Sequence, residues 1–195
     1  MIRLKELYKK EIIPKMKQKF NLKNDLGVPK ISKVVISIGT GAALSDGKLM
    51  DEIKQNISLI SGQKPVELKA KKAISGFKIR KGQVVGLKVT LREVRMYHFL
   101  DKMINIAMPR TKDFKGLSAS FDGNGNITIG IKEHIVFPEI DESVEKIHGF
   151  EVVINTTTKN NEQAKELLTL FGFRFSASAK GYGGFAETLS KGGKE

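Results

Sequence analysis

Apolar residues recur along the chain with periods that alternate between those of helices and those of strands. Residues 3–20 carry an apolar residue at every fourth position, opposite a lysine-rich face, and this predicts an amphipathic helix: Leu4, Tyr8, Ile12, Met16 and Phe20. Pro14 lacks a backbone N–H, so we expect a kink or two short helices. Comparable stripes predict helices over 49–60, 93–107 and 161–171. The helix over 93–107 is expected to end at Pro109 and to bury five residues: Met96, Leu100, Met103, Ile104 and Ala107.

Alternating apolar and polar positions predict strands between these helices. Residues 33–38 place Val34, Ile36 and Ile38 on one face and Lys33, Val35 and Ser37 on the other. Residues 84–92 set Leu87, Val89 and Leu91 against Lys88, Thr90 and Arg92 in the same way. Further strands are expected over 66–69, 127–131 and 150–157. Gly and Asn-Gly turns suggest hairpins, which favours an α+β fold with one domain over 1–175 and a flexible Gly, Ser and Lys tail over 176–195.

The chain is strongly basic. Its 195 residues hold 34 Lys and Arg against 21 Asp and Glu, a formal charge of +13. The excess lies in two segments, with 10 basic and 3 acidic residues over 1–33 and 10 and 2 over 64–95. Both segments carry periodic apolar residues, which favours a basic face on a folded protein, although a solvated lysine-rich surface is the alternative. Nucleic acid is the first partner to consider.

Several other classes of protein are disfavoured. The absence of cysteine excludes disulfides, thiolate metal sites and cysteine nucleophiles. Because there is no apolar run of 18 residues and no signal-peptide core, we expect an intracellular protein without a membrane segment. His98, His134 and His148 are too scattered to suggest a metal site, and no cofactor is expected. The segment 41–48 has the wrong glycine spacing for a phosphate loop and is better explained as a turn entering a helix.

The loop over 69–86 concentrates cations around a single aromatic residue. The aromatic residue lies between Gly76 and Gly82, the loop has no acid, and the residues that give it this character are Lys69, Lys71, Lys72, Phe77, Lys78, Arg80 and Lys81. Lysine and arginine suit phosphates, and an exposed ring can stack on a base or a ribose. An ordinary hairpin with Phe77 folded into the core explains the pattern equally well.

Six short blocks, in order, carry a resemblance to a known family. They are Ser61–Pro65, Gly76–Arg80, Lys88–Arg92, Asp113–Ser118, Phe137–Asp141 and Thr156–Thr158. Together they resemble the bacterial-type ribosomal protein five of the large subunit, the 5S-rRNA-binding family of the central protuberance, over about residues 2–175.

The resemblance implies a single α+β domain whose antiparallel sheet has helices on one face and an open face that holds 5S rRNA. The rRNA-binding positions it implies are Lys33, Ser37, Gly39, Gly41, Gln63, Lys64, Thr90 and Arg92. It also implies that a loop over 75–84 reaches peptidyl-site tRNA through Phe77, Lys78, Arg80 and Lys81. Further implied partners are large-subunit rRNA, neighbouring proteins of the central protuberance and, through 110–145, a head protein of the small subunit. The implied location is the cytoplasmic ribosome.

The chain departs from the family pattern in places. The family usually has Asn where Ser37 stands, and serine reaches less far. The segment 117–121 is one residue shorter than is common, and the tail over 176–195 has no usual counterpart.

Two alternatives stand beside this non-catalytic interpretation. One is an RNA-processing enzyme that uses acids near a turn: Glu139, Asp141, Glu142 and Glu145. The other is a general RNA chaperone, which binds RNA without sequence or shape preference.

Overall fold

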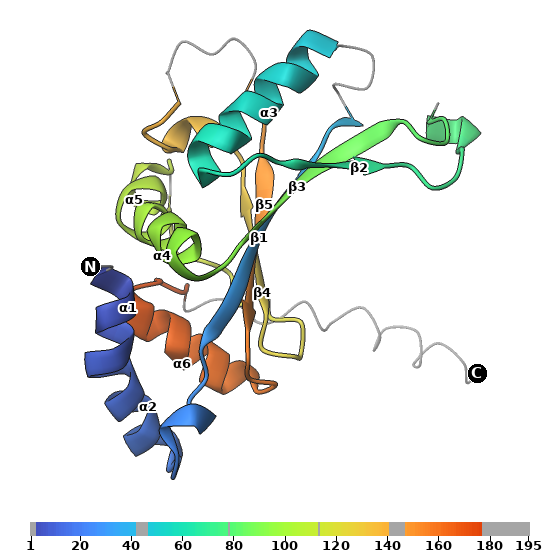
Figure 1. Cartoon of the computed structure of the whole chain (residues 1–195). Coiled ribbons are helices and arrows are strands. Elements are labelled where there is room, and N and C mark those ends of the chain that lie inside the picture. Colours follow the sequence, from blue (N-terminus) through green and yellow to red (C-terminus); the bar gives the residue numbers. More distant parts are fainter. Residues whose placement is uncertain (1–2, 42–46, 78, 113, 141–146, 177–195) are drawn as a thin grey trace, which may run out of the picture.

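The five strands form one antiparallel sheet with the spatial order β2-β3-β1-β5-β4 (Figure 1). The structure is a computed structural model that describes residues 3–41, 47–77, 79–112, 114–140 and 147–176. The strands are β1 (Ile31–Gly39), β2 (Val66–Lys69), β3 (Val84–Leu91), β4 (Ile127–Ile131) and β5 (Phe150–Thr156). All five were predicted, and each boundary lies within two residues of the expected one.

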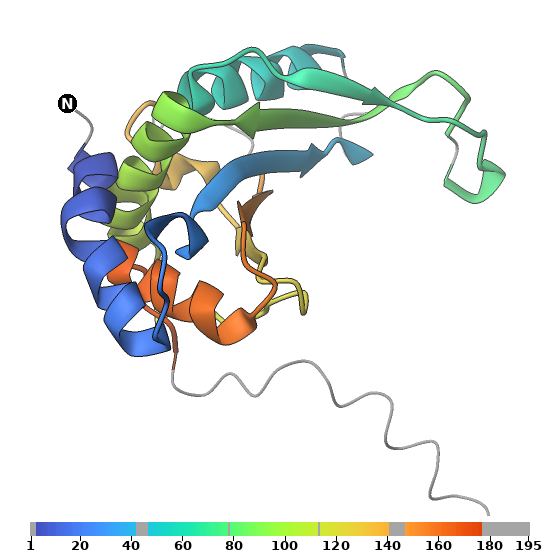
Figure 2. The ribbon, with the colours of Figure 1, turned by 60° about the horizontal axis from the view of Figure 1, so that its bottom comes forward.

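The helices lie on one face of this sheet (Figure 2). They are α1 (Arg3–Leu7), α2 (Ile13–Phe20), α3 (Gly47–Ser61), α4 (Glu93–Lys102), α5 (Met108–Arg110) and α6 (Asn161–Phe171). Their apolar stripes and one face of the sheet enclose a single core, which confirms the expected one-domain α+β fold.

Strand alternation decides which side chains enter that core. In β1, Val34, Ile36 and Ile38 are buried, whereas Val35 and Ser37 between them are only half-buried. Antiparallel pairing aligns these residues with buried partners, because Ile36 lies opposite Val89 of β3 and Val152 of β5. Each fully buried aliphatic side chain contributes about 1.5–3 kcal/mol. A one-residue slip would expose the whole set, so the register is strongly specified.

Pro14 divides the first helix, as expected. A π-helical turn over Tyr8–Ile12 joins α1 to α2, and the N–H of Ile13 bonds to the carbonyl of Tyr8, five residues earlier. Pro14 follows within the first turn of α2, where the missing N–H costs little. Leu4, Ile12 and Met16 therefore still reach the core.

The helix expected over 93–107 continues to Arg110, so the prediction that Pro109 closes it is wrong. A second π-helical turn, Met103–Ala107, precedes α5, and Pro109 occupies the first turn of that helix. Ile104, expected to be buried, is only half-buried because the wider turn rotates it towards the edge of the core.

Two of the three histidines are in contact, contrary to the expectation that they are scattered. The rings of His134 and His148 stack with centroids 3.7 Å apart. His134 is fully buried, and its Nε2 lies 3.5 Å from the amide nitrogen of Asn56 on α3. The spacing of these two histidines in the sequence does not predict their contact, because the fold brings together residues that are 14 positions apart. The described residues contain no cluster of three or more potential metal ligands.

Burial lowers the pKa of His134 below its ordinary value of 6.5. As the pH falls through 6.5 the unfolded chain gains a proton that the folded protein resists, so we predict that stability decreases from pH 7 to pH 5.5. NMR titration of His134 and denaturant unfolding at each pH check this. A His134→Gln variant should lose less stability over the same interval, and a His134 midpoint at or above 6.5 would contradict the assignment.

Candidate nucleic-acid interface

The face of the sheet away from the helices presents polar side chains in rows that cross the strands. Ser37 on β1 lies between Lys88 on β3 and Glu151 on β5. Because neighbouring strands lie about 4.8 Å apart, the backbones at the two ends of this row are about 10 Å apart. Lys33 pairs with Asn155 in a second row. We call this surface the open face.

The structure brings six of the eight expected rRNA-binding positions to the open face and its rims. Lys33, Ser37 and Thr90 point from β1 and β3 onto that face, as their alternation predicted, and are half-buried. Gly39 ends β1 and is exposed, and Arg92 is exposed where β3 meets α4. Gln63 is half-buried and follows α3, and its side-chain nitrogen lies 3.5 Å from the Thr90 carbonyl.

The other two positions are less closely tied to this surface. Lys64 is exposed in the turn before β2. Gly41 is exposed beyond the end of β1. The residues that follow it, 42–46, lie outside the described residues, and they make up most of the segment 41–48 that was compared with a phosphate loop.

Sequence reasoning missed two groups at this surface. Arg95 on α4 donates a hydrogen bond to the side-chain oxygen of Gln63 at 3.3 Å, and Glu151 adds a carboxylate to an otherwise basic face. Arg95 lies in the first turn of α4, and Arg92 is the extended residue that precedes this helix, so both belong to the junction between β3 and α4. Glu151 alternates with buried Phe150 and Val152, and that alternation was the available signal.

Glycines hollow out the open face beside this row. A depression of about 600 Å³ is bounded by Ser37, Gly39, Gly130, Gly149 and Glu151, among others. At Gly39 and Gly130 an added Cβ would meet no atom within 4 Å, so these glycines leave room for a ligand to approach the backbone.

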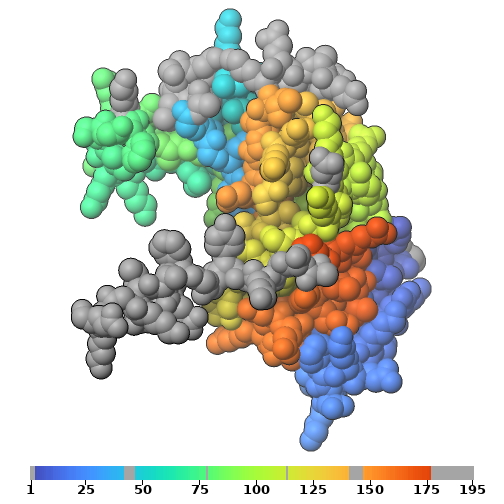
Figure 3. Space-filling model, turned by 180° about the vertical axis from the view of Figure 1, so that it is seen from behind, coloured from blue at the N-terminus to red at the C-terminus, as the bar shows by residue number. Residues whose placement is uncertain are grey.

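The hairpin that β2 and β3 form continues beyond the end of β1 as an arm, defined as residues 66–85 (Figure 3). Its end is held by backbone hydrogen bonds, including Ala70 N–H to the Gln83 carbonyl at 2.8 Å and Ile74 N–H to the Ile79 carbonyl at 2.9 Å. Phe77 is 73% exposed, so the alternative that folds it into the core is wrong. Arg80 and Lys81 lie beside it, and Lys78 lies outside the described residues.

The two basic segments differ in how their charges are used. Five cations of the N-terminal segment form salt bridges with acids: Arg3, Lys10, Lys15, Lys17 and Lys19. In the part of the arm that the structure describes, no salt bridge joins Lys69, Lys71, Lys72, Arg80 or Lys81 to an acid. Glu67, the acid in this arm, is paired instead with Lys54 of α3 at 2.7 Å. The pairing lowers the pKa of Glu67 and raises that of Lys54. The arm therefore presents uncompensated positive charge.

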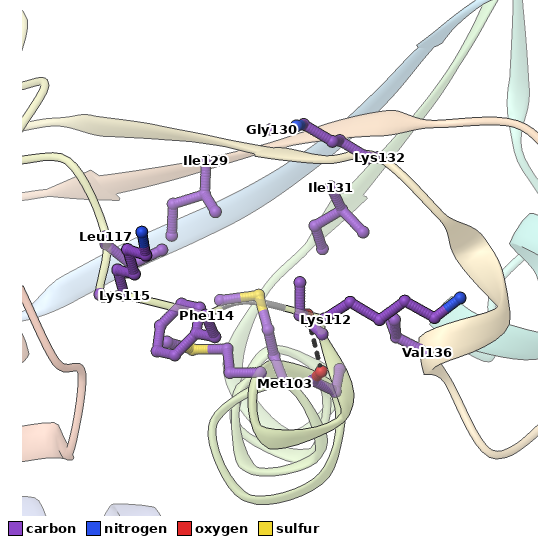
Figure 4. Close-up of a pocket in the computed structure, with 14 residues that line it drawn as sticks. Met103, Lys112, Phe114, Lys115, Leu117, Ile129, Gly130, Ile131, Lys132 and Val136 are labelled. Atoms are coloured by element: carbon purple, nitrogen blue, oxygen red, sulfur yellow. Dashed lines mark hydrogen bonds between the residues drawn. The ribbon is translucent and has the colours of Figure 1, made fainter.

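An apolar pocket of about 280 Å³ lies on the opposite side of the sheet (Figure 4). Met103 and Phe114 line it beneath Ile129 and Ile131 of β4, and three lysines surround it. Among the residues that the structure describes, its lining contains no carboxylate or imidazole. Glu139, a candidate of the enzyme alternative, forms a salt bridge with Lys102 at 2.5 Å, and Asp141, Glu142 and Glu145 lie outside the described residues.

No described helix has the length and hydropathy to span a membrane.

A sheet with helices on one side, a polar open face, a hollow bordered by glycines and a basic arm without described salt bridges is the arrangement expected of a protein that binds RNA. Comparison with known protein families gives two matches, and both are to one ribosomal family. Residues 24–80 match the family described as "Ribosomal protein L5", and residues 84–175 match the model of the C-terminus of the same ribosomal family.

Curated relatives are similar over nearly their whole length. The "Large ribosomal subunit protein uL5" of Dichelobacter nodosus is 52% identical over 177 residues, which cover 90% of this chain and 99% of the relative. Its counterpart in Syntrophomonas wolfei has the same identity and coverage, and that of Caldanaerobacter subterraneus is 51% identical over 178 residues. The chain belongs to the ribosomal protein L5 family. It is a structural protein of the large ribosomal subunit that functions in translation, and it is not an enzyme.

The unequal pairing of charge predicts which lysines contact phosphates. Replacing Lys71 and Lys72 by Gln should weaken RNA binding and reduce the slope of log affinity against log salt by about 0.7–0.9 per lost contact. Replacing Lys10 and Lys15 removes the same charge, but these lysines already pair with Glu6 and Glu11, so the slope should hardly change. Filter-binding titrations over 50–200 mM salt compare the two variants. Equal slopes in both would contradict the distinction.

Proposed function

We propose that this protein binds 5S rRNA through its open face and thereby helps to anchor that RNA in the central protuberance. The observation that carries the proposal is the polar face of β1 and β3, where Lys33, Ser37 and Thr90 lie on a surface that no described helix covers. An antiparallel sheet commonly packs one face on the core and leaves the other open. A polar face that no described helix covers is therefore available to a partner.

The chemistry of the open face suits an RNA helix or loop. The deep groove of A-form RNA excludes side chains, so proteins recognise RNA by shape, by ribose 2′-hydroxyls and by the edges of unpaired bases. Thr90 and Ser37 supply hydroxyl groups, and Gln63 supplies an amide, each able both to donate and to accept. Lys33, Lys64 and Arg92 supply the cations for phosphates at the rims. The glycines let the RNA backbone approach closely.

The arm extends this proposal to a second RNA. Figure 3 shows the end of the arm projecting from the body of the protein, and Phe77 and Arg80 in this segment are exposed, so a ligand at the arm need not touch the open face. We assign the arm, with Phe77, Lys78, Arg80 and Lys81, to peptidyl-site tRNA, because an exposed ring can stack on a base while unpaired cations hold phosphates.

Protein partners belong to other surfaces. We assign 110–145 to a head protein of the small subunit, and neighbouring central-protuberance proteins and large-subunit rRNA to the remaining surfaces of the folded domain. The shortened segment 117–121 is anchored at its start, because Leu117 N–H bonds to the Arg174 carbonyl and Ser176 N–H bonds to the Leu117 carbonyl. Ser176, the first residue of the expected tail, is therefore tied to the domain, and 177–195 lies outside the described residues.

The assignment of the open face is tested by changing its hydroxyl and amide groups. A Thr90→Val, Gln63→Ala double variant should lower the affinity for 5S rRNA at least about tenfold, because each polar group left unsatisfied in the complex costs about 1–3 kcal/mol. Isothermal titration at near-physiological salt measures the loss. The matched control, Thr169→Val with Gln18→Ala, makes the same chemical changes on exposed helical positions and should bind normally. Unchanged affinity in the Thr90 and Gln63 variant would refute the assignment.

The assignment of the arm predicts separable activities. Phe77→Ala or Arg80→Ala should leave 5S rRNA affinity intact and weaken retention of peptidyl-tRNA on reassembled ribosomes. Leu26 is 92% exposed on a turn far from the arm in the sequence, so Leu26→Ala serves as the control for removal of an exposed apolar side chain. Equal loss of both activities would instead place the arm on the rRNA.

A further inference from the structure

Arg95 contacts the side chain of one proposed RNA-binding residue without lying in the sheet itself. Its guanidinium donates to the Gln63 side-chain oxygen at 3.3 Å, and the Gln63 side-chain nitrogen lies 3.5 Å from the Thr90 carbonyl. The amide of Gln63 is thus held between α4 and β3, with one contact at each of its polar atoms.

The backbone on either side of this amide is fixed as well. Gly62 adopts a left-handed conformation at φ +65°, and its N–H bonds to the Ser58 carbonyl at 2.8 Å, which ends α3. The Ser61 hydroxyl accepts from the Gln63 N–H at 3.2 Å, and its single proton faces the Ile57 carbonyl at 2.6 Å and the Gln63 carbonyl at 2.9 Å. The side-chain torsions of Gln63 are left for Arg95 and Thr90 to fix.

The hydrogen-bonding capacity of the amide shows what remains for a ligand. A glutamine side chain has two N–H donors and two acceptor lone pairs. Thr90 takes one donor and Arg95 occupies one lone pair, so one donor and one acceptor remain side by side. Because arginine can only donate, its contact selects one of the two flipped orientations of the amide.

The start of α4 is built in a way that supports Arg95. Glu93 has φ +48°, a left-handed conformation that is costly for a residue with a side chain. Arg92 follows the last residue of β3 and is the N-cap of α4, and Glu93 is the first residue of that helix, so the strained residue stands at the change of direction between strand and helix, two residues before Arg95.

We infer that Arg95 is a positioning residue that orients the amide of Gln63 for RNA, and that this amide recognises an adjacent donor–acceptor pair on the ligand. An adenine base edge offers such a pair, with its N6 donor beside its N7 acceptor. This inference rests on the proposed binding of RNA at Gln63. The competing explanation is that Arg95, which is exposed, binds a phosphate directly.

A double-mutant cycle with a salt series separates the two explanations. The proteins are the full chain with Arg95→Gln, with Gln63→Ala and with both changes, each titrated with 5S rRNA. A positioning role predicts that Arg95→Gln weakens binding about 3- to 10-fold, as expected for one net hydrogen bond of about 1 kcal/mol. It also predicts little further loss when Gln63 is already Ala, and an unchanged salt slope.

Arg110→Gln is the matched control, because it removes the same charge from an exposed position at the end of α5. In the free protein, the NMR signals of the Gln63 side-chain amide should lose their distinct shifts in Arg95→Gln and not in Arg110→Gln. This readout requires no RNA.

Three results would overturn the inference. Additive losses, with a salt slope reduced by about 0.7–0.9 in Arg95→Gln, would make Arg95 a phosphate contact. An unaltered Gln63 amide signal in Arg95→Gln would show that Arg95 does not orient it. If Gln63→Ala alone binds 5S rRNA normally, the proposed role of Gln63 fails and the inference fails with it. In the first two cases the proposed function survives.

Discussion

The structure depends on one constraint, which is that strands β1, β3, β4 and β5 bury alternate residues on the side of the sheet where the helices lie, whereas the edge strand β2 is exposed. Val34, Ile36 and Ile38 of β1 align with buried residues of β3 and β5, and the helices lie on that side of the sheet, where α3 and α4 contact the strands and α1 and α2 contact α4 and α6. The register of the strands therefore determines which face the helices cover, and the buried contacts with the helices in turn hold that register. The opposite face is left with Lys33, Ser37 and Thr90, and its polarity follows from the same alternation that builds the core.

The N-terminal helices and the arm differ in how many of their cations are paired with acids more than in how many cations they hold. The N-terminal helices and the arm hold similar numbers of cations, but the helices pair many of theirs with acids, for example Lys19 with Glu166 of α6 at 2.6 Å. Such pairs contribute little stability, about 0–1 kcal/mol each when exposed, yet they lower the local positive potential. The arm keeps its charge free, and Phe77 stands exposed within it. This contrast explains why a single basic protein can offer separate surfaces to different RNA ligands under the proposed function.

Periodicity in the sequence was sufficient to predict the sheet and most helices, because these elements bury regular stripes. Strand 127–131 and helix 161–171 were predicted with their observed boundaries. The π-helical turns before Pro14 and Pro109 were not, because each adjusts a helix to its neighbours in the core. The stacking of His134 on His148 and the contact of Arg95 with Gln63 were missed for a related reason. They join residues 14 and 32 positions apart, and no local pattern encodes the return of the chain.

The most direct test of the central claim is a gel-shift titration of the whole protein with 5S rRNA at near-physiological salt, with tRNA and a scrambled RNA as competitors. Recognition by the open face predicts tight 5S rRNA binding that survives both competitors, because shape-specific polar contacts add to the phosphate attraction common to all RNAs. Equal affinity for the three RNAs would mean that charge alone drives binding, and would contradict the account.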